Sequence, residues 1–366
     1  MDRHAGDDSG DQAPQAPGTL ALEDFQLSGN SLILHPIPTA DPNDPLNWSF
    51  WRKTVNISLV MLYVTLTFTQ LDIGLVAYEQ YLDELGFSVN DLNGANALGY
   101  AGLGFGSVFF IPLMHKYGRR PVYIASLTLQ VGACIWLALT KTKADLWVGN
   151  ALAGLGGAVC ETIVQVTIAD IFFVHQHASL NAYYLFFTSV GASLAPVAAG
   201  YVVESQGWRW IWWWSVILIA ANLVLVIFLF EESKYVVIMD GQDDSNPQGS
   251  HHDEAAEEMD PAKVDDVVVQ TRSHRHINSR IPAKSYLQRM ALLTTTDGPV
   301  FGHILDPFVV LATFPAVTFA AITFGSLLAL FALLAAVQAI YLLEPPYNFS
   351  AIGVGLMNLA PVSAGR

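Results

Sequence analysis

Long apolar blocks separated by polar segments dominate the sequence. A helix needs about 20 apolar residues to cross the hydrocarbon layer of a bilayer, which is about 30 Å thick. Blocks of that length lie at 54–77, 93–114, 121–140, 146–173, 179–203, 210–230 and 308–343. A last apolar stretch, at 351–365, is cut short by the end of the sequence. Lipid offers no partner for unpaired backbone groups, so the pattern predicts seven complete transmembrane helices and part of an eighth.

The polar segments divide these blocks into two groups. The N-terminal tail is rich in Asp, Pro and Gly, and it lacks the basic start and short apolar core of a cleaved signal peptide. Four parts are predicted: a disordered cytoplasmic tail at 1–50, a six-span bundle at 51–230, a cytoplasmic linker loop at 231–305 and an incomplete C-terminal bundle at 306–366. Within the linker, "KSYLQRMALL" alternates basic and apolar residues, which suits the inner membrane surface.

Composition excludes several classes of function. The chain is 52% hydrophobic and only 13% charged, whereas soluble domains carry about 25% charged residues. The net charge of −15 comes largely from acids in the tail and at 231–266, and no basic face suited to nucleic acid is present. Cys134 and Cys160 lie in apolar blocks and form neither a disulfide framework nor a metal-ligand pattern. No nucleophile–base pair or phosphate loop is found, so we expect neither an enzyme nor a cofactor.

The short loops indicate the orientation in the membrane. Basic residues gather in alternate loops, namely at Arg52, Lys53, Lys116, Arg119, Arg120, Lys234, Lys284 and Arg289. The opposite side begins with "EQYLDELGFSVND", which has no Lys or Arg, and then carries Lys141, Lys143 and Arg209 alone. This bias predicts a cytoplasmic N-terminus and a cytoplasmic linker. The aromatic segment "WRWIWWW", at 208–214, is predicted to mark an outer membrane boundary.

Four motifs together carry a resemblance to a known family. They are "DPNDPLNW" before the first span, "PLMHKYGRRPVY" after the second, "GASLAPVAAG" in the fifth and "EPPYNFSAIGVGLMNLAP" between the seventh and eighth. From about residue 41 onward the chain resembles the major facilitator superfamily, specifically the fungal drug:proton antiporter group with twelve spans. The segment "GLGGAVCETIVQVTIADIFFVHQH" looks closest to the branch that holds polyamine and histidinol permeases. The resemblance implies an all-α major facilitator fold with a complete N-terminal bundle and a partial C-terminal bundle.

The loop after the second span departs from the family pattern. Gly118, Arg119 and Arg120 keep their places, but His115 stands where the family usually has Asp, and Ile111 where it has Gly. In the family that Asp belongs to a charge-relay contact that latches the outward-facing state. A latch of His115, Gly118, Arg119 and Arg120 is therefore expected to be weakened or rebuilt. By charge alone, the basic cluster is a topology anchor.

Two acids lie inside predicted spans, where an ionisable group is costly and therefore a functional candidate. Asp72 is late in the first span and Glu161 is in the fourth; Gln165 follows on the same helical face as Glu161. The resemblance places both acids near the central cavity, where they could exchange protons or bind a cation. The alternatives are an interfacial Asp72 and a Glu161 that forms a structural hydrogen bond. Asp170, at the inner end of the fourth span, is predicted to lie in a solvated loop.

Glycine and proline in the spans indicate close packing and a bend. Glycines are dense in the second and fourth spans, where small residues let helix backbones approach. In the fifth span Pro196 removes a backbone donor, and Gly191 and Gly200 narrow the helix, which predicts a bend packed against another span. That this segment favours exchange is implied by the family's antiporter motif alone.

The resemblance implies a proton-coupled secondary transporter of small organic solutes that works by alternating access. Efflux of drug-like or secondary metabolites is the family's common use, and uptake of polyamine-like cations is the alternative suggested by the branch. A transport-inactive, truncated membrane protein is a third possibility. The expected partners are an organic solute, protons and the lipid bilayer of the plasma membrane, and nucleic acid is not expected.

Overall fold

A computed structural model describes Pro36, Thr39 and residues 41–235, 284–295, 305–342 and 345–357. This part of the chain is helical and contains no strand. Its elements up to the fourth span are η2 (Pro45–Asn47), α1 (Phe50–Asp72), η3 (Ile73–Ala77), α2 (Tyr78–Leu85), α3 (Val89–Tyr117), α4 (Arg120–Ala138) and α5 (Lys143–Ile171). Those that follow are α6 (Val174–Ser189), η4 (Val190–Leu194), α7 (Ala195–Gln206), α8 (Arg209–Leu229), α10 (Tyr286–Arg289), α11 (Asp306–Thr313), α12 (Pro315–Tyr341) and α13 (Ala351–Met357).

Seven helical stretches in the described residues are long and apolar enough to cross a membrane, as the hydropathy pattern predicted. They are Phe50–Leu85, Val89–Tyr117, Arg120–Ala138, Lys143–Ile171, Val174–Gln206, Arg209–Leu229 and Pro315–Gln338. The predicted eighth span begins as α13, and its remainder lies outside the described residues. The predicted tail and most of the predicted linker also lie outside them.

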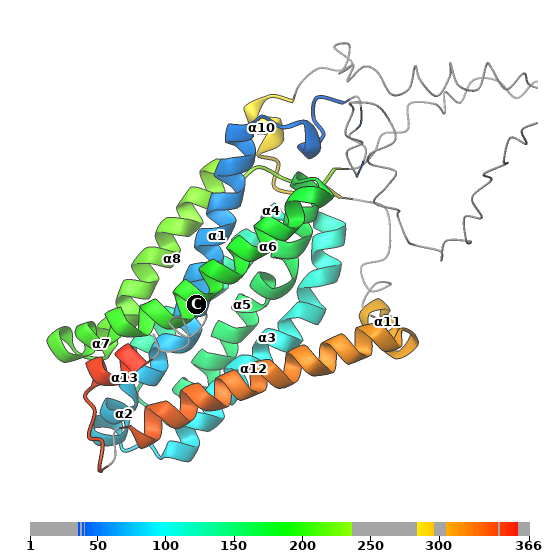
Figure 1. Ribbon diagram of the computed structural model, residues 1–366. Helices are drawn as coiled ribbons and strands as arrows, with labels where there is room; N and C mark the ends of the chain where they lie inside the picture. The colour runs from blue at the N-terminus through cyan, green and yellow to red at the C-terminus, as the bar shows by residue number, and fades with distance from the viewer. Residues whose placement is uncertain are drawn as a thin grey trace, which may run out of the picture. The chain divides into compact units, whose positions relative to one another are not determined.

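The helices of the first six spans pack against one another around a shared apolar core. In Figure 1, α1, α4, α5 and α8 run side by side, and α3 lies along α5. Each of α1, α4 and α5 contributes fully buried side chains to this core, for example Val64, Leu127 and Ile163. The bundle therefore holds α5 between α3 and α4, with the centre of the helix shielded from the surroundings.

The first span continues further than its hydropathy predicted. The helix passes from α1 through the 3₁₀ turn η3 into α2 and ends at Gly86, which adopts the left-handed conformation at φ 64°. The segment expected as an outer loop is thus mostly helical, because Tyr78 and Tyr81 are buried and anchor α2 to the bundle. The indole Nε1 of Trp212 donates a hydrogen bond of 2.9 Å to the Tyr81 hydroxyl.

The aromatic segment at the start of α8 differs in part from a membrane-boundary belt. Trp210 and Trp214 are exposed, as such a belt requires, but Trp208 and Trp212 are almost fully buried. Trp208 donates from Nε1 to the Glu84 carboxylate at 2.9 Å. Two of these tryptophans therefore fasten α8 to α2, because a buried indole N–H needs an acceptor.

Glycines bring α3 and α5 into close contact, as the sequence predicted. A Cβ atom added at Gly154 would overlap the carbonyl group of Gly99, and one at Gly106 would lie 2.9 Å from the carbonyl oxygen of Leu155. These contacts involve backbone atoms, which cannot move aside as a flexible side chain can. The two helices can therefore approach this closely only where Cβ atoms are missing.

The fifth span changes its helical geometry before its proline. The π-helical turn η4 separates α6 from α7, and Pro196 follows in the first turn of α7. Because proline lacks a backbone N–H, the regular helical pattern is interrupted here. A Cβ at Gly191 would overlap the carbonyl oxygen of Thr65 in α1, so the turn packs directly on the first span. Gly200 is buried further along α7.

We expect Gly154→Ala to lower the free energy of unfolding by about 1–3 kcal/mol, because the new methyl group must push α3 away from α5. Thermal unfolding of the purified chain in detergent micelles measures this effect. Gly132→Ala in α4 is the matched control, since no atom lies within 4 Å of its added Cβ. Equal unfolding temperatures for the two variants would contradict a tight α3–α5 contact.

Candidate functional site

An ion pair joins the start of the third span to the end of the fourth. Arg119 Nε lies 2.8 Å from Asp170 Oδ2, and Arg119 Nη2 donates to Asp170 Oδ1 at 3.1 Å. Both side chains are largely buried, at 10% and 21% exposed. The two-point geometry suits a guanidinium group and a carboxylate. The expectation of a solvated loop at Asp170 was therefore wrong, because α5 continues through this residue and carries it to Arg119.

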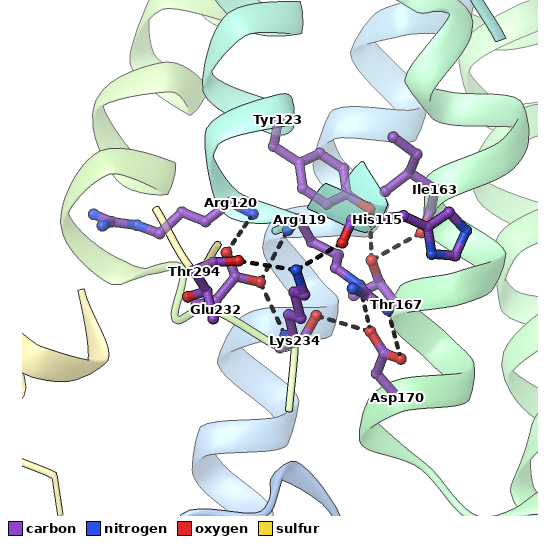
Figure 2. Close-up of polar contacts among 11 residues, drawn as sticks. His115, Arg119, Arg120, Tyr123, Ile163, Thr167, Asp170, Glu232, Lys234 and Thr294 are labelled. Carbon is purple, nitrogen blue, oxygen red and sulfur yellow. Dashed lines mark hydrogen bonds and ion pairs between the residues drawn. The ribbon is translucent and has the colours of Figure 1, made fainter. Parts of the chain in front are cut away.

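A second carboxylate caps the start of α4. Glu232, which follows α8, accepts the backbone N–H of Arg119 at 2.9 Å and that of Arg120 at 3.1 Å (Figure 2). The first N–H groups of a helix have no partner within the helix, and a negative charge there also suits the helix dipole. Gly118 has φ 105°, and a Cβ at this position would overlap the Glu232 carboxylate. Glycine is thus required here for both its conformation and its size.

Lys234 caps the C-terminal end of α3, the second span. Its Nζ donates to the carbonyl oxygens of His115, Lys116 and Thr294, at 2.7, 2.9 and 2.9 Å. The first two are among the last carbonyl groups of α3, which a cation stabilises. Burial is the largest effect on the pKa of Lys234 and lowers it; nearby Arg119 also lowers it, and Glu232 raises it. The three carbonyl groups offset part of the cost of burying this charge.

Arg120 points to a different part of the chain from Arg119. Its Nη2 donates to the carbonyl oxygen of Ile227, near the end of α8, at 2.6 Å, and its Nη1 donates to that of Met290. Thr294 in the same segment donates its N–H to the Tyr117 carbonyl at 3.0 Å. The second loop, the end of α8 and residues 284–295 are therefore joined through polar contacts on one side of the bundle.

The motif before the first span joins the same network. Asp44 accepts the N–H of Leu46 at 2.9 Å and so shapes the turn η2, while Lys53 Nζ donates to the Leu46 carbonyl at 3.1 Å. Arg52 forms an ion pair with Glu231, next to the capping residue of α4. The start of the first span is thereby fixed to the chain that leaves the sixth.

These contacts bring together three of the four residues of the predicted latch. Gly118, Arg119 and Arg120 surround the Glu232 carboxylate, which the sequence analysis did not assign to the latch. His115 contributes its backbone carbonyl oxygen, which accepts from Lys234. That the His115 side chain takes the place of the family's Asp stays a prediction. We use "inner network" below for Arg119, Arg120, Asp170, Glu232 and Lys234.

Asp72 is a buried carboxylate at the end of α1. It is 6% exposed, and its Oδ1 accepts a hydrogen bond of 3.0 Å from the hydroxyl of Tyr100 on α3. None of the ion pairs in the described residues includes it. An ionised carboxylate with one hydroxyl partner is costly to bury, and either a proton or a bound cation removes that cost.

Glu161, in the middle of α5, also has a tyrosine hydroxyl beside it but is only partly buried. Its Oε2 is 3.5 Å from the hydroxyl of Tyr184 on α6, a long hydrogen bond, and the same hydroxyl is 3.4 Å from the carbonyl oxygen of Cys160. Gln165 lies one turn further along α5 and is also partly exposed. Asp72 and Glu161 thus bond to tyrosines on different helices, so each belongs to its own hydrogen-bonded pair.

A polar cluster in the core was missed by the sequence analysis. The hydroxyl groups of Tyr63 on α1 and Ser126 on α4 are 2.7 Å apart, and Ser126 donates to the Gly156 carbonyl on α5 at 2.6 Å. Gln130 Nε2 lies 3.3 Å from the Tyr63 hydroxyl and 3.3 Å from Thr67 Oγ1. The sequence carried one signal for this cluster, the spacing of its polar residues. Tyr63 and Thr67 are four residues apart on one helical face, and so are Ser126 and Gln130.

Comparison with known proteins identifies a family model that matches residues 59–365, the Major Facilitator Superfamily. An uncharacterized MFS-type transporter of Schizosaccharomyces pombe is 33% identical over 207 residues, which cover 54% of this chain and 36% of the relative. Protein HOL1 of Saccharomyces cerevisiae is 33% identical over 196 residues, which cover 53% and 33%. Polyamine transporter 4 of the same yeast is 29% identical over 179 residues, which cover 46% and 26%. The chain spans about a third of the length of these relatives.

We expect Asp170→Asn to lower the free energy of unfolding by about 3 kcal/mol, because it leaves the buried Arg119 guanidinium without an opposite charge. Lys143→Gln is the control, since it breaks the pair with Asp91 from a side chain that is 56% exposed and leaves the hydrogen bonds between Asp91 and Ser88 in place. An exposed pair of this kind contributes little, so the loss of stability should be far smaller. Thermal unfolding in detergent compares the two variants. A larger loss for Lys143→Gln would refute the central role of the Arg119–Asp170 pair.

Proposed function

Because the chain belongs to the major facilitator superfamily, we propose that it acts as a proton-coupled secondary transporter of small organic solutes, working by alternating access. The observation that carries this proposal is the pair of carboxylates at Asp72 and Glu161, each in a membrane-spanning helix and each hydrogen-bonded to a tyrosine. A residue of this kind inside a span typically lies on an ion or substrate path.

The two carboxylates would serve as proton or cation sites. Neither is part of an ion pair in the described residues, so a protonated form and a cation-bound form are both compatible with their surroundings. Gln165 adds an amide that can bond to a polar solute on the Glu161 face of α5. The preference for a solute with positive charge follows from these acids, and the similarity to Polyamine transporter 4 supports it.

The conformational change would involve two regions. The inner network would hold one state of the transporter through the Arg119–Asp170 pair and the Glu232 cap. The π-helical turn before Pro196 would allow the fifth span to bend where Gly191 meets the first span. Gly200, which has no side chain, would keep the cross-section of α7 small further along the fifth span. Both regions must rearrange when the side open to solvent changes.

The proposal also covers the direction of transport, the orientation of the chain in the membrane and the membrane in which it lies. The antiporter-type segment Gly191–Gly200 favours efflux of the solute in exchange for protons. Uptake of polyamine-like cations is the second candidate, favoured by the intramembrane acids and by the similarity to Polyamine transporter 4. The basic loops favour a cytoplasmic N-terminus and an inner network on the cytoplasmic side of the plasma membrane. Membership of the drug:proton antiporter group belongs to the same proposal.

We expect Glu161→Gln and Asp72→Asn each to reduce transport driven by a proton gradient by about tenfold, a change of about 1.4 kcal/mol. Purified chain in lipid vesicles would be tested with a pH gradient, labelled spermidine and a fluorescent cationic drug. The direction of the gradient that drives each solute separates efflux from uptake.

Glu79→Gln on α2 is the matched control, because it removes an exposed carboxylate and should leave transport unchanged. Wild-type rates in both intramembrane variants would overturn their assignment as coupling sites. Absence of transport by the unmodified chain, in protein that still unfolds cooperatively, would overturn the proposed activity for this polypeptide.

A further inference from the structure

A pocket lies beside the inner network, where three segments of the chain meet. Its lining combines Trp48 from the motif before the first span, Arg52 from α1, Lys234 after α8, and Lys284 with Arg289 from the segment 284–295. We call it the basic pocket. The Lys284 N–H donates to Asn43 Oδ1 at 2.8 Å, so the segment 284–295 is fastened directly to the motif that forms the opposite wall.

Positive charge exceeds negative charge around the basic pocket. Four basic side chains line it, against the single carboxylate of Glu232. Glu231 neutralises part of this charge from outside the lining, through its ion pairs with Arg52 and Arg289. Asp41 also lies next to the lining, where it accepts hydrogen bonds from Asn43 and Tyr235. The positive surplus is therefore that of the lining side chains themselves. A cluster of cations with this surplus attracts a ligand that carries negative charge.

Two donors at the pocket lack acceptors. Trp48 is 7% exposed, and its indole Nε1 has no hydrogen-bond partner among the described residues. The Nε of Arg289 is likewise buried and without a partner in the same part of the chain. A buried donor left unpaired costs about 1–3 kcal/mol. A ligand that offers several acceptor oxygens, as a phosphate group does, would satisfy both donors and the surplus charge together.

Apolar side chains lie on the segment 284–295, which also supplies Lys284, Gln288, Arg289 and Thr294 to the lining of the pocket. Tyr286, Leu292 and Leu293 are each about half exposed, and the Tyr286 hydroxyl donates to the carbonyl oxygen of Phe228 at 2.5 Å. Phe228 itself is exposed near the end of a membrane-spanning helix. The segment that lines the pocket therefore carries half-exposed apolar side chains and lies against the end of a candidate membrane-spanning helix, the depth at which lipid headgroups lie. This setting favours a ligand with acyl chains over a freely soluble anion.

We propose that the basic pocket binds the phosphate of an anionic phospholipid headgroup from the surrounding leaflet. Lys284 and Arg289 contact the phosphate oxygens, and the Trp48 indole N–H donates to one of them. The bound lipid fastens the segment 284–295 to the motif before the first span and to the chain after α8. Its negative charge also offsets the positive surplus beside the inner network. This binding does not depend on the proposed transport activity.

Lipid binding is measured by native mass spectrometry of the full chain in detergent, with dioctanoyl phosphatidylinositol 4-phosphate as the probe and dioctanoyl phosphatidylcholine as the neutral reference. We expect Lys284→Gln to weaken binding of the anionic lipid about fivefold, which corresponds to about 1 kcal/mol for one basic residue. Lys284 is exposed, and the variant keeps the backbone hydrogen bond to Asn43, so folding is preserved. Trp48→Phe should also weaken binding while it keeps an aromatic ring.

Lys143→Gln is the matched control, because it removes an exposed lysine at the start of α5, outside the lining of the pocket. Equal binding by Lys284→Gln, Lys143→Gln and the unmodified chain would overturn the proposal. Equal affinity for the anionic and the neutral lipid would do the same. Soluble inositol 1,4-bisphosphate and inorganic phosphate form the last arm. If either binds as tightly as the anionic lipid, the site is one for free phosphate and the assignment to lipid is wrong.

Discussion

The contacts among the loop after α3, the end of α5 and the chain after α8 depend on one constraint: a charge that leaves water needs an opposite charge or several hydrogen bonds. The guanidinium of Arg119 meets it with Asp170, and the ammonium of Lys234 meets it with three carbonyl groups. Glu232 meets it with the backbone N–H groups at the start of α4. Each solution joins segments from different spans. The need to pair charges therefore determines how the loop after α3, the end of α5 and the chain after α8 are held together.

The intramembrane acids differ from the inner network in how far they satisfy this constraint. Asp170 has an arginine, whereas Asp72 and Glu161 have a single tyrosine hydroxyl each in the described part of the chain. A carboxylate paired with a guanidinium group cannot take up a proton without losing its ion pair. A carboxylate with one neutral partner can gain a proton or a cation without breaking an ion pair. This difference separates residues suited to hold a conformation from residues suited to bind and release.

Hydropathy was sufficient to predict the spans, because lipid requires continuous apolar helices. It could not predict that α2 continues the first span, since Tyr81 and Glu84 are held there by tryptophans more than 120 residues away. The two acids inside spans were found because a charge in an apolar block is conspicuous. Asp170 was misjudged for the opposite reason: it stands near a polar segment, and only the approach of Arg119 over 51 residues of separation reveals its burial.

In the proposed transport cycle, α5 would couple the inner network to the intramembrane acids, because it carries Asp170 of the network and Glu161 of the acids. Glu161 and Asp170 are nine residues apart on one helix, which places them about 13–14 Å apart along its axis. The helix contains no proline, and its glycines hold it tightly against α3. A rigid, closely packed helix transmits a shift at one end to the other rather than absorbing it. Release of the Arg119–Asp170 pair would therefore move the turn that carries Glu161, while Asp72, on α1, would respond only through contacts between helices.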